Sequence, residues 1–485
     1  MNKFVILIGI FFSAALAAND KLLIENITIV SSHLSAPNTN MNVLLNNGRI
    51  EQITSQKITD YDAKIDGVDK FLAPGLMDSH VHVSSVPGMG FGVEPLAVKH
   101  PQIVAAYYEQ QPKSFLYYGV TQVLDPNPGL NSKHFTNAAN HPDYFRCEVI
   151  TSKDTFPYVE KTDSLSQSMY RYLVDEAAAA NKPDSAESLV QQIASSGASC
   201  IKLYFEDGYG DANQWQLLSS ATLKRIKVEA DKHNLLIVAH ANAFDMQQLA
   251  LAAGVDVIAH GMWNWGQFRR HRDVPAEIAA TLDVIIDEQV GYMPTQRVIA
   301  GLGEVMLPTT ASSPQFLAVT PAPLLDWYQT PQAQWFKEEL RIGFDGMADN
   351  AIAEIFLYGR IGKGNKVIQY LNHANHPILL ASDFPGSPSY ANQPGLTTFQ
   401  EMKAMANAGL SPAQVLAAAT INNAKQFKMD ADYGTVQVGK KANLLVLERN
   451  PLASVEAWDS IETVILNGKP IARQVLVAGN EKSLN

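Results

Sequence analysis

Two histidines separated by one residue follow an apolar segment early in this 485-residue chain. Residues 71–83 read FLAPGLMDSHVHV, so His80 and His82 come directly after a run with the composition of a β-strand. Side chains two positions apart in a strand point to the same face, and the two imidazoles would therefore lie side by side. Neutral imidazole is a common ligand of zinc and related metals. The pattern indicates a metal site, with two solvated histidines as the alternative.

Polar residues also end several later apolar runs. Lys202, His240, His260 and Asp383 each lie in or directly after such a run. Each has an ordinary explanation alone: a buried core histidine, a lysine that reaches solvent, or an aspartate that caps the next helix. Their recurrence at the ends of apolar runs favours one shared site. The runs are the segment before His80 and residues 119–126, 144–150, 199–205, 235–242, 255–261, 290–295 and 377–383.

The elements that carry these residues alternate between strands and helices. Apolar strands that alternate with helices predict a parallel sheet covered on both faces, and eight such units predict a closed (β/α)8 TIM-type barrel. In that barrel the chemistry lies at the carboxyl ends of the strands. Gly254 is expected to end one helix, and Ser411-Pro412 to begin another. Residues 307–325 are rich in Pro, Ser and Thr, and we expect a loop there that covers the barrel mouth.

The two ends of the chain share a different style, with short strands and tight turns. Asn47-Gly48 lies between two apolar runs, which is typical of a β-hairpin. Similar strands and Asn-Gly turns return after residue 429. We therefore predict a small β-sandwich domain built from both ends. The predicted division is a signal peptide at 1–17, the first part of the β domain at 18–70, the barrel at 71–428 and the second part of the β domain at 429–485.

The net charge and the N-terminal sequence limit which partners and which cellular compartment are expected. The net charge of −11 argues against nucleic acid, because its phosphates would repel the chain. Lys3, an apolar stretch at 4–16 and the small residues around Ala17 predict a cleaved signal peptide, with an uncleaved anchor as the alternative. We expect export to a periplasm or to the medium, no stable membrane insertion after cleavage, and a small-molecule substrate. The sequence is compatible with a homo-oligomer.

Only two cysteines are present, Cys147 and Cys200, so the chain is not a disulfide scaffold. Each lies in an apolar run that reads as a strand. Two buried thiols are the expectation from the sequence, and a single disulfide in an oxidising compartment is the alternative.

The whole pattern resembles the amidohydrolase superfamily of metal-dependent hydrolases. The resemblance runs from about Leu22 to Ile471, and its most specific part is Pro74-Gly75 followed by Asp78-x-His80-x-His82. The later segments VAHAN, VDVIAHG and LLASD match in order, as does GLSPAQVLAAAT followed by GTVQVGKKANLLVL. The branch it resembles in particular contains imidazolonepropionase-like enzymes and prolidase-type dipeptidases. In that branch the fourth-strand lysine, here in CIKLY, is carboxylated and bridges two metals.

The resemblance implies a binuclear site. Lys202, N6-carboxylated, would bridge two divalent ions; His80, His82 and Asp383 would hold one ion, and His240 and His260 the other. Nitrogen and oxygen ligands without thiolate suit zinc best, with manganese, cobalt and iron as alternatives. Two such ions acidify a bridging water and polarise a carbonyl. Asp383 would then accept the proton of the attacking water and pass it to the leaving amine.

Two positions depart from the branch, and the substrate pocket is less defined. Leu124 stands where an arginine is common, so a contact that this arginine would make with the substrate or with a metal ligand is in doubt. Asn443 stands where an aspartate is common in the C-terminal strand motif. Four further residues lie on or just after the predicted strands, and we consider them candidates for substrate binding. For each of them, ordinary loop packing is the alternative. They are Tyr204, Asn242, Trp263 and Arg297, the last as a partner for a substrate carboxylate.

The expected function is that of an exported binuclear-metal hydrolase. It would cleave the C–N bond of a dipeptide, an N-acyl amino acid or a cyclic amide. A lactonase or a phosphotriesterase with the same site is the main alternative. A one-metal deaminase is disfavoured, because those enzymes place a glutamate where this chain has Ala243. A non-catalytic binding protein on the same scaffold is a further alternative.

Overall fold

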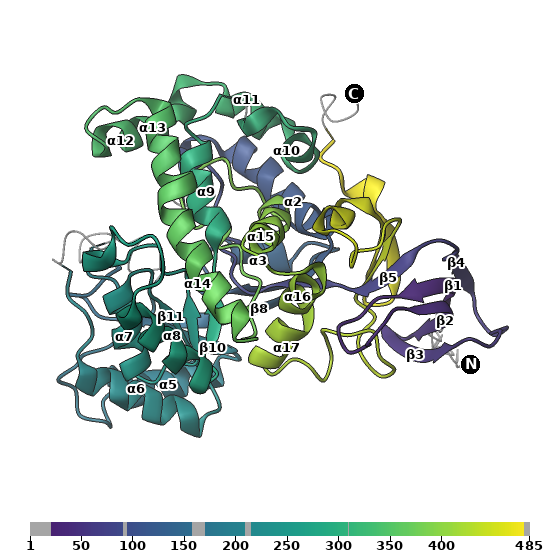
Figure 1. Ribbon diagram of the computed structural model, residues 1–485, viewed down its shortest axis with the longest axis horizontal. Coiled ribbons are helices and arrows are strands. Elements are labelled where there is room, and N and C mark those ends of the chain that lie inside the picture. Colours follow the sequence, from purple (N-terminus) through teal and green to yellow (C-terminus); the bar gives the residue numbers. More distant parts are fainter. Residues whose placement is uncertain (1–20, 91–94, 158–169, 209–214, 309, 480–485) are drawn as a thin grey trace, which may run out of the picture.

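The computed structural model describes residues 21–90, 95–157, 170–208, 215–308 and 310–479. The predicted signal peptide at 1–17 lies outside these residues. Strands from both ends of the chain form a β unit at one side of the molecule, and the rest forms a larger α/β body (Figure 1). Within the described residues, no helix is both long and apolar enough to cross a bilayer.

The β unit is one mixed sheet of eight strands, with β4 attached beside β1. Its order is β16-β15-β14-β5-β1-β2-β3, so the antiparallel pair β5–β14 joins the two ends of the chain. The predicted association of the two ends is confirmed, although the strands pair into one continuous sheet where we expected a sandwich. The strands are β1 (Leu22–Ile29), β2 (Asn38–Asn46), β3 (Arg49–Thr54), β4 (Ala63–Asp66), β5 (Phe71–Pro74), β14 (Leu444–Leu447), β15 (Ile461–Leu466) and β16 (Lys469–Ala472).

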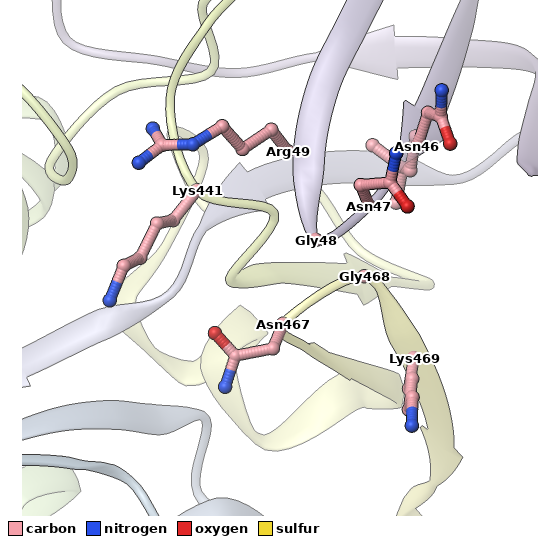
Figure 2. A pocket seen from close by; sticks show the side chains of 9 residues that line it. Asn46, Asn47, Gly48, Arg49, Lys441, Asn467, Gly468 and Lys469 are labelled. Atoms are coloured by element: carbon pink, nitrogen blue, oxygen red, sulfur yellow. The ribbon is translucent and has the colours of Figure 1, made fainter. Parts of the chain in front are cut away.

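Two Asn-Gly hairpin turns meet in this unit (Figure 2). Asn47-Gly48 joins β2 to β3 and Asn467-Gly468 joins β15 to β16, with positive φ at all four residues, as type I′ turns require. A Cβ on Gly468 would lie 3.0 Å from Cα of Gly48, so the turns can approach only because both are glycine. Both turns hydrogen-bond to the backbone of Ala442. Local turn chemistry therefore fixes how the two ends of the chain dock.

Asn443, which stands where an aspartate is common in the resembled branch, ties the β unit to the body. Its Nδ2 donates to Oδ2 of Asp143 at 3.0 Å, and its Oδ1 accepts from the backbone N–H of Asn467 at 2.7 Å. A carboxylate at position 443 would face the carboxylate of Asp143. The amide is thus the side chain that satisfies both neighbours here.

The body is organised around a second sheet, whose seven main strands are parallel and follow the order β13-β12-β11-β10-β8-β7-β6. The short β9 (Tyr172–Leu173) pairs with β8. These strands match seven of the eight apolar runs in the sequence. They are β6 (Leu76–Asp78), β7 (Val120–Asp125), β8 (Asp143–Thr151), β10 (Cys200–Tyr204), β11 (Leu236–His240), β12 (Val257–Ala259) and β13 (Gly291–Met293).

The eighth apolar run lies between the two outer strands of this sheet. Ile378 forms a parallel bridge with Tyr292 of β13, and Phe384 forms one with Val81 after β6. The backbone N–H of Ser79 also donates to the carbonyl of Leu380 at 3.1 Å. The run therefore reaches the position expected of an eighth strand, as an extended segment with isolated bridges.

Helices surround the sheet, and two boundary predictions are confirmed. Gly254, with φ of +73°, follows the end of α7, and Ser411 caps α16 with Pro412 in its first turn. The helices are α1 (Pro95–Lys99), α2 (Pro101–Tyr117), α3 (Ser132–Thr136), α5 (Ala186–Ser195), α6 (Ser220–Lys232), α7 (Phe244–Ala252), α8 (Ala276–Asp287), α9 (Gln296–Glu304), α10 (Pro314–Val319), α11 (Ala322–Tyr328), α12 (Trp335–Gly343), α13 (Asp349–Glu354), α14 (Ile361–His373), α15 (Leu396–Asn407), α16 (Pro412–Ala417) and α17 (Asn423–Gln426).

The expected loop at 307–325 is largely helical. Ser313 caps α10 by accepting from the backbone N–H of Phe316, and Pro314 occupies the first turn of that helix. Pro321 precedes α11, which begins at Ala322. A Ser-Pro pair and a proline before a short helix are start signals, and the same residues also read as loop formers. The proline-rich composition therefore marked helix boundaries here.

Cys147 and Cys200 form a disulfide, which corrects the expectation of two free thiols. The two residues lie opposite each other in the parallel pair β8–β10, with Cα atoms 4.3 Å apart. Both are completely buried, in an apolar cluster enclosed by the parallel strands. Cys200 lies two residues before Lys202 on the same strand, so the disulfide sits beneath the candidate site.

Candidate active site

The carboxyl ends of the parallel strands bring the six predicted ligands together. His80 and His82 follow β6, Lys202 lies within β10, and His240 ends β11. His260 comes directly after β12, and Asp383 lies in the extended segment between β13 and β6. Their convergence follows from topology, because parallel strands present all their carboxyl ends to the same edge.

Asp383 is the centre of one half of the cluster. Its Oδ1 lies 3.1 Å from Nε2 of His82 and 3.4 Å from Nε2 of His80. Its Oδ2 lies 3.4 Å from Nδ1 of His260. One ligand atom from each of His80, His260 and Asp383 falls within 4.8 Å of the other two. This spacing is small enough for one ion to contact all three side chains.

His240 and His260 face each other in the other half, with ring centroids 4.5 Å apart. Nε2 of His240 lies 3.2 Å from Oε2 of Glu206. His80 links the halves, because its ring is 5.0 Å from that of His260. The four imidazoles thus form a continuous cluster above the buried floor of the sheet.

Three residues at these strand ends have strained backbone conformations. His260, Thr295 and Asp383 have φ of +84°, +42° and +53°, a region that non-glycine residues rarely adopt. Each such residue costs on the order of 1–3 kcal/mol and persists only where the surroundings enforce it. The hydroxyl of Thr295 is 3.1 Å from Nδ1 of His260, so two of the strained residues contact each other directly. Strain at this place indicates a functional site.

Burial shifts four basic groups of the site towards their neutral forms. It lowers the pKa of Lys202 to about 7, with Asp383 opposing the shift. It also lowers the pKa values of His80, His240 and His260, and for each of them the nearby Lys202 adds to the effect. Neutral imidazole and neutral amine are the forms that can bind a metal ion or react with an electrophile. The pocket therefore favours the chemically competent states.

The donor set fits divalent metal ions. Among the described residues, no hydrogen-bond partner is found for three buried nitrogens: Nζ of Lys202, Nδ1 of His80 and Nδ1 of His82. Leaving such atoms unpaired is costly unless something else satisfies them. Imidazole nitrogens with a carboxylate and no thiolate match zinc and its neighbours in preference to soft metals.

Further carboxylates support the ligands from behind. Asp78 accepts from the backbone N–H of Ser382 at 3.0 Å and from the hydroxyl of Thr398 at 2.6 Å, which ties β6 to the Asp383 segment. Burial raises the pKa of Asp78 to about 6. Asp125, at the end of β7, is 3.9 Å from Nδ1 of His82 and accepts from the hydroxyl of Tyr144. These contacts orient side chains that the sequence could only place near one another.

Sequence reasoning missed Glu206 and Thr295. Glu206 lies four residues after Lys202, and strand alternation would put the side chains of Lys202, Tyr204 and Glu206 on one face. That alternation was a usable signal, although the strand ends at Tyr204. Thr295 offered none, because its role depends on a left-handed backbone at the start of α9.

Of the four candidates for substrate binding, two have rings beside the histidines and two pair with acidic side chains. The ring of Tyr204 is 5.3 Å from that of His240, and Trp263 is 5.8 Å from His260. Asn242 donates to Glu206 at 2.9 Å. Arg297 is buried and pairs through both terminal nitrogens with Glu304 at 2.5 and 2.7 Å. The guanidinium of Arg297 is therefore occupied within the protein.

Sequence comparison gives a family for the C-terminal part of the chain. Residues 359–471 match the profile of the amidohydrolase family. A stretch of 72 residues is 43% identical to an imidazolonepropionase of Symbiobacterium thermophilum, which is 14% of this chain and 16% of that enzyme. The C-terminal part of the chain is thus similar in sequence to the amidohydrolase family. The match spans less than two thirds of the imidazolonepropionase's length.

Solved structures share the fold of this chain over nearly its whole length. A Xaa-Pro dipeptidase with bound methionine superposes with a TM-score of 0.61 and 19% identity, covering 93% of this chain and all of the dipeptidase. A molinate hydrolase superposes with a TM-score of 0.65 and 17% identity, covering 94% and 95%. The resemblance to the branch with imidazolonepropionase and prolidase, inferred from motifs, is confirmed.

Proposed function

We propose that this chain is an exported hydrolase that cleaves a C–N bond with a site for two divalent metal ions, zinc being the best match. Its substrate would be a dipeptide, an N-acyl amino acid or a cyclic amide. One observation carries the proposal: four histidines, Asp383 and the buried amine of Lys202, which has no hydrogen-bond partner among the described residues, converge at the carboxyl ends of a parallel sheet. The proposed frame is a (β/α)8 barrel that residues 378–384 close.

The chain's own residues divide into two groups around the ions. His80, His82 and Asp383 would hold one ion, and His240 and His260 the other. When bound, the two ions would acidify the attacking water and polarise the scissile carbonyl. Asp383, which contacts three histidines, would accept the proton of the water at a free carboxylate lone pair and deliver it to the departing amine.

Lys202 would bridge the ions as its carbamate. Carbamate formation joins the neutral amine to carbon dioxide, forms one N–C bond and releases one proton. Burial favours the neutral amine that this step needs, since it lowers the pKa of Lys202 to about 7. Nζ also has no hydrogen-bond partner to lose. As part of an anionic carbamate, the side chain of Lys202 could bind both ions, which a free amine could not do.

An aromatic wall beside His240 would contact the substrate. Phe156 stacks on Trp215 at 4.6 Å between ring centroids and also packs against Tyr204 at 5.5 Å. Trp263 stands beside His260 on the other side. We propose Tyr204 and Trp263 as substrate contacts. Asn242 and Arg297 remain weaker candidates, because Glu206 and Glu304 engage them.

Export is supported by one independent feature besides the N-terminal sequence. The disulfide between Cys147 and Cys200 suits an oxidising compartment, where such bonds form and persist. We therefore propose a mature chain that begins near residue 18 and acts in a periplasm or outside the cell. Mass spectrometry of the intact exported protein tests the cleavage site directly.

Hydrolysis assays of the mature, metal-loaded protein test the activity. The panel holds dipeptides, N-acyl amino acids, cyclic amides, lactones and phosphotriesters, with released amine and released acid measured separately. Amine release is the expected result. Acid from lactones alone would assign the ester-cleaving alternative, and ammonia from a heterocyclic amine would assign deamination. No turnover of any amide would contradict the proposal.

A further inference from the structure

Glu206 is a fully buried carboxylate that directly contacts a predicted metal ligand. Its Oε2 lies 3.2 Å from Nε2 of His240 and accepts from Nδ2 of Asn242 at 2.9 Å. Its Oε1 accepts from the backbone N–H of Gly208 at 3.0 Å. Both oxygens are therefore engaged, and the carboxylate is held in one orientation.

Two groups face Nε2 of His240: Oε2 of Glu206 at 3.2 Å and Nδ2 of Asn242 at 3.4 Å, and the shorter contact, with the carboxylate, bears on which nitrogen of the ring can bind a metal. A neutral imidazole carries one N–H, and a carboxylate at Nε2 favours the proton on that nitrogen. Nδ1 is then unprotonated and offers its lone pair. A carboxylate behind a histidine ligand also makes the imidazole more basic towards the ion.

We propose that Glu206, held by Asn242, is a positioning residue that fixes His240 with the proton on Nε2 and Nδ1 open to the second metal ion. The inference rests on the proposed binuclear site. It also gives Asn242 a different role from the one expected: its amide group orients Glu206, and its effect on turnover passes through His240. The two halves of the site would then each contain one carboxylate, Asp383 in the first and Glu206 in the second.

Two other roles for Glu206 fit the contacts less well. A direct metal ligand needs an oxygen that no protein donor outside the metal-binding set occupies, but Oε1 of Glu206 accepts from the backbone N–H of Gly208 and Oε2 accepts from the amide of Asn242. A proton shuttle would need to exchange protons with substrate, and Glu206 has no exposed surface. The hydrogen-bonded, buried carboxylate is suited to orienting a ring.

The test uses Glu206→Gln and Glu206→Ala, with Asp207→Asn as the matched control. Asp207 is the adjacent acid, and within the described residues no hydrogen bond joins it to His240. The affinity of each of the two metal sites for zinc is measured by chelator competition on the full mature chain. The tautomer of His240 is measured by nitrogen NMR on the metal-free protein, which does not depend on activity.

The wild-type protein should show His240 with its proton on Nε2, and both Glu206 variants should lose that preference. Affinity for the second zinc ion should fall about 10- to 100-fold in Glu206→Ala and less in Glu206→Gln, while the first ion binds as before. Asp207→Asn should match the wild type. Asn242→Ala should also lower the affinity for the second zinc ion, by a smaller factor. This variant replaces Glu206→Ala in the test if Glu206→Ala does not fold.

Unchanged affinity for both ions in the Glu206 variants, or a wild-type His240 protonated on Nδ1, would overturn the assignment. Loss of the second ion with an unchanged tautomer would overturn it too, in favour of a direct ligand. A wild-type protein that binds one zinc ion or none would instead contradict the proposed binuclear site. The tautomer measurement on the metal-free protein would still decide the role of Glu206 in that case.

Discussion

At the scale of single residues, Asp383 is the side chain that contacts three of the four histidines in the cluster. Its two oxygens lie within 3.4 Å of His80, His82 and His260, and its own φ is positive. A side chain so placed can hold an ion and also exchange a proton with a nearby water. The two roles can be separated by a substitution that keeps size and removes basicity.

Asp383→Asn should keep the fold and lose turnover by about 10³-fold, the range typical of a lost general acid–base. The amide retains one oxygen for an ion and cannot accept a proton. Steady-state kinetics and metal content on the same sample measure the two effects. Turnover at the wild-type rate would show that another group carries the proton.

Lys202→Ala should lose at least one metal ion per chain and about 100-fold or more in activity, because the bridge between the two halves is missing. Added short carboxylic acids should restore part of the activity by occupying the vacated space as an anionic bridge. Metal analysis with and without added acid checks this. Full metal content in the variant would exclude the bridging role.

The sequence was sufficient to identify the side chains that converge and insufficient for the residues behind them. Each of these side chains interrupts or ends an apolar run: His80, His82, Lys202, His240, His260 and Asp383. Thr295 could not be found, because its contact with His260 depends on a backbone conformation that no local pattern specifies. The pairing of Arg297 with Glu304 could not be predicted either, because it depends on the side-chain conformations of two residues within the same helix.

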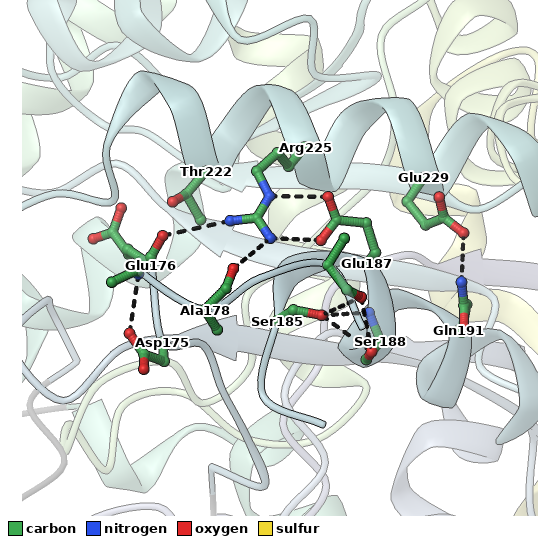
Figure 3. Close-up of polar contacts among 12 residues, drawn as sticks. Asp175, Glu176, Ala178, Ser185, Glu187, Ser188, Gln191, Thr222, Arg225 and Glu229 are labelled. Carbon is green, nitrogen blue, oxygen red and sulfur yellow. Dashed lines mark hydrogen bonds and ion pairs between the residues drawn. The ribbon is translucent and has the colours of Figure 1, made fainter. Parts of the chain in front are cut away.

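At the scale of elements, pairs of neighbouring helices are fastened by specific polar contacts. Arg225 on α6 forms a two-pronged ion pair with Glu187 on α5, at 2.9 and 2.7 Å, and also donates to the carbonyl of Ala178 (Figure 3). The side chains of Arg225 and Glu187 are 27% and 22% exposed. The contact joins the helices that flank β10, the strand that carries Lys202.

Arg225→Ala should destabilise the protein by about 1 kcal/mol and lower its Tm by about 2 °C, with Lys224→Ala as the exposed neighbouring control. Arg225 holds the pKa of Glu187 below its usual value. This stabilisation is therefore present above the unfolded pKa of about 4.3 and is lost as the pH falls further. Thermal melts from pH 7 to pH 3 should show the difference shrinking below pH 4. A constant difference would mean that packing alone is affected.

Strands were easier to predict from the sequence than the helices after β13. Barrel-type strands are buried on both faces, so each one reads as a short apolar run with clear ends. The helices α10 to α13 have six to nine residues each, too few for a clear helical period. Their prolines favour a loop unless the caps are recognised, as at Ser313.

At the scale of the whole molecule, long-range pairing joins segments that are distant in the sequence. The union of both chain ends could be anticipated, because the same turn chemistry recurs at Asn47-Gly48 and Asn467-Gly468. The disulfide could not, because it depends on the register that sets Cys147 opposite Cys200. A one-residue slip would turn one sulfur to the other face of the sheet.

The disulfide leads to a prediction for the purified protein. Protein purified from an oxidising compartment should show no free thiol under denaturing conditions, and two thiols after reduction. Thiol titration with mass spectrometry distinguishes the two states. Two free thiols in the unreduced, active enzyme would contradict the disulfide and remove its support for export.

The binuclear centre can be tested most directly by anomalous X-ray scattering at the zinc edge from crystals of the mature protein. The account predicts two zinc peaks about 3.5–4 Å apart among the histidines, with Lys202 carrying extra density between them. One peak at His80, His82 and Asp383, with Lys202 unmodified, would contradict the two-metal account and favour a one-metal mechanism.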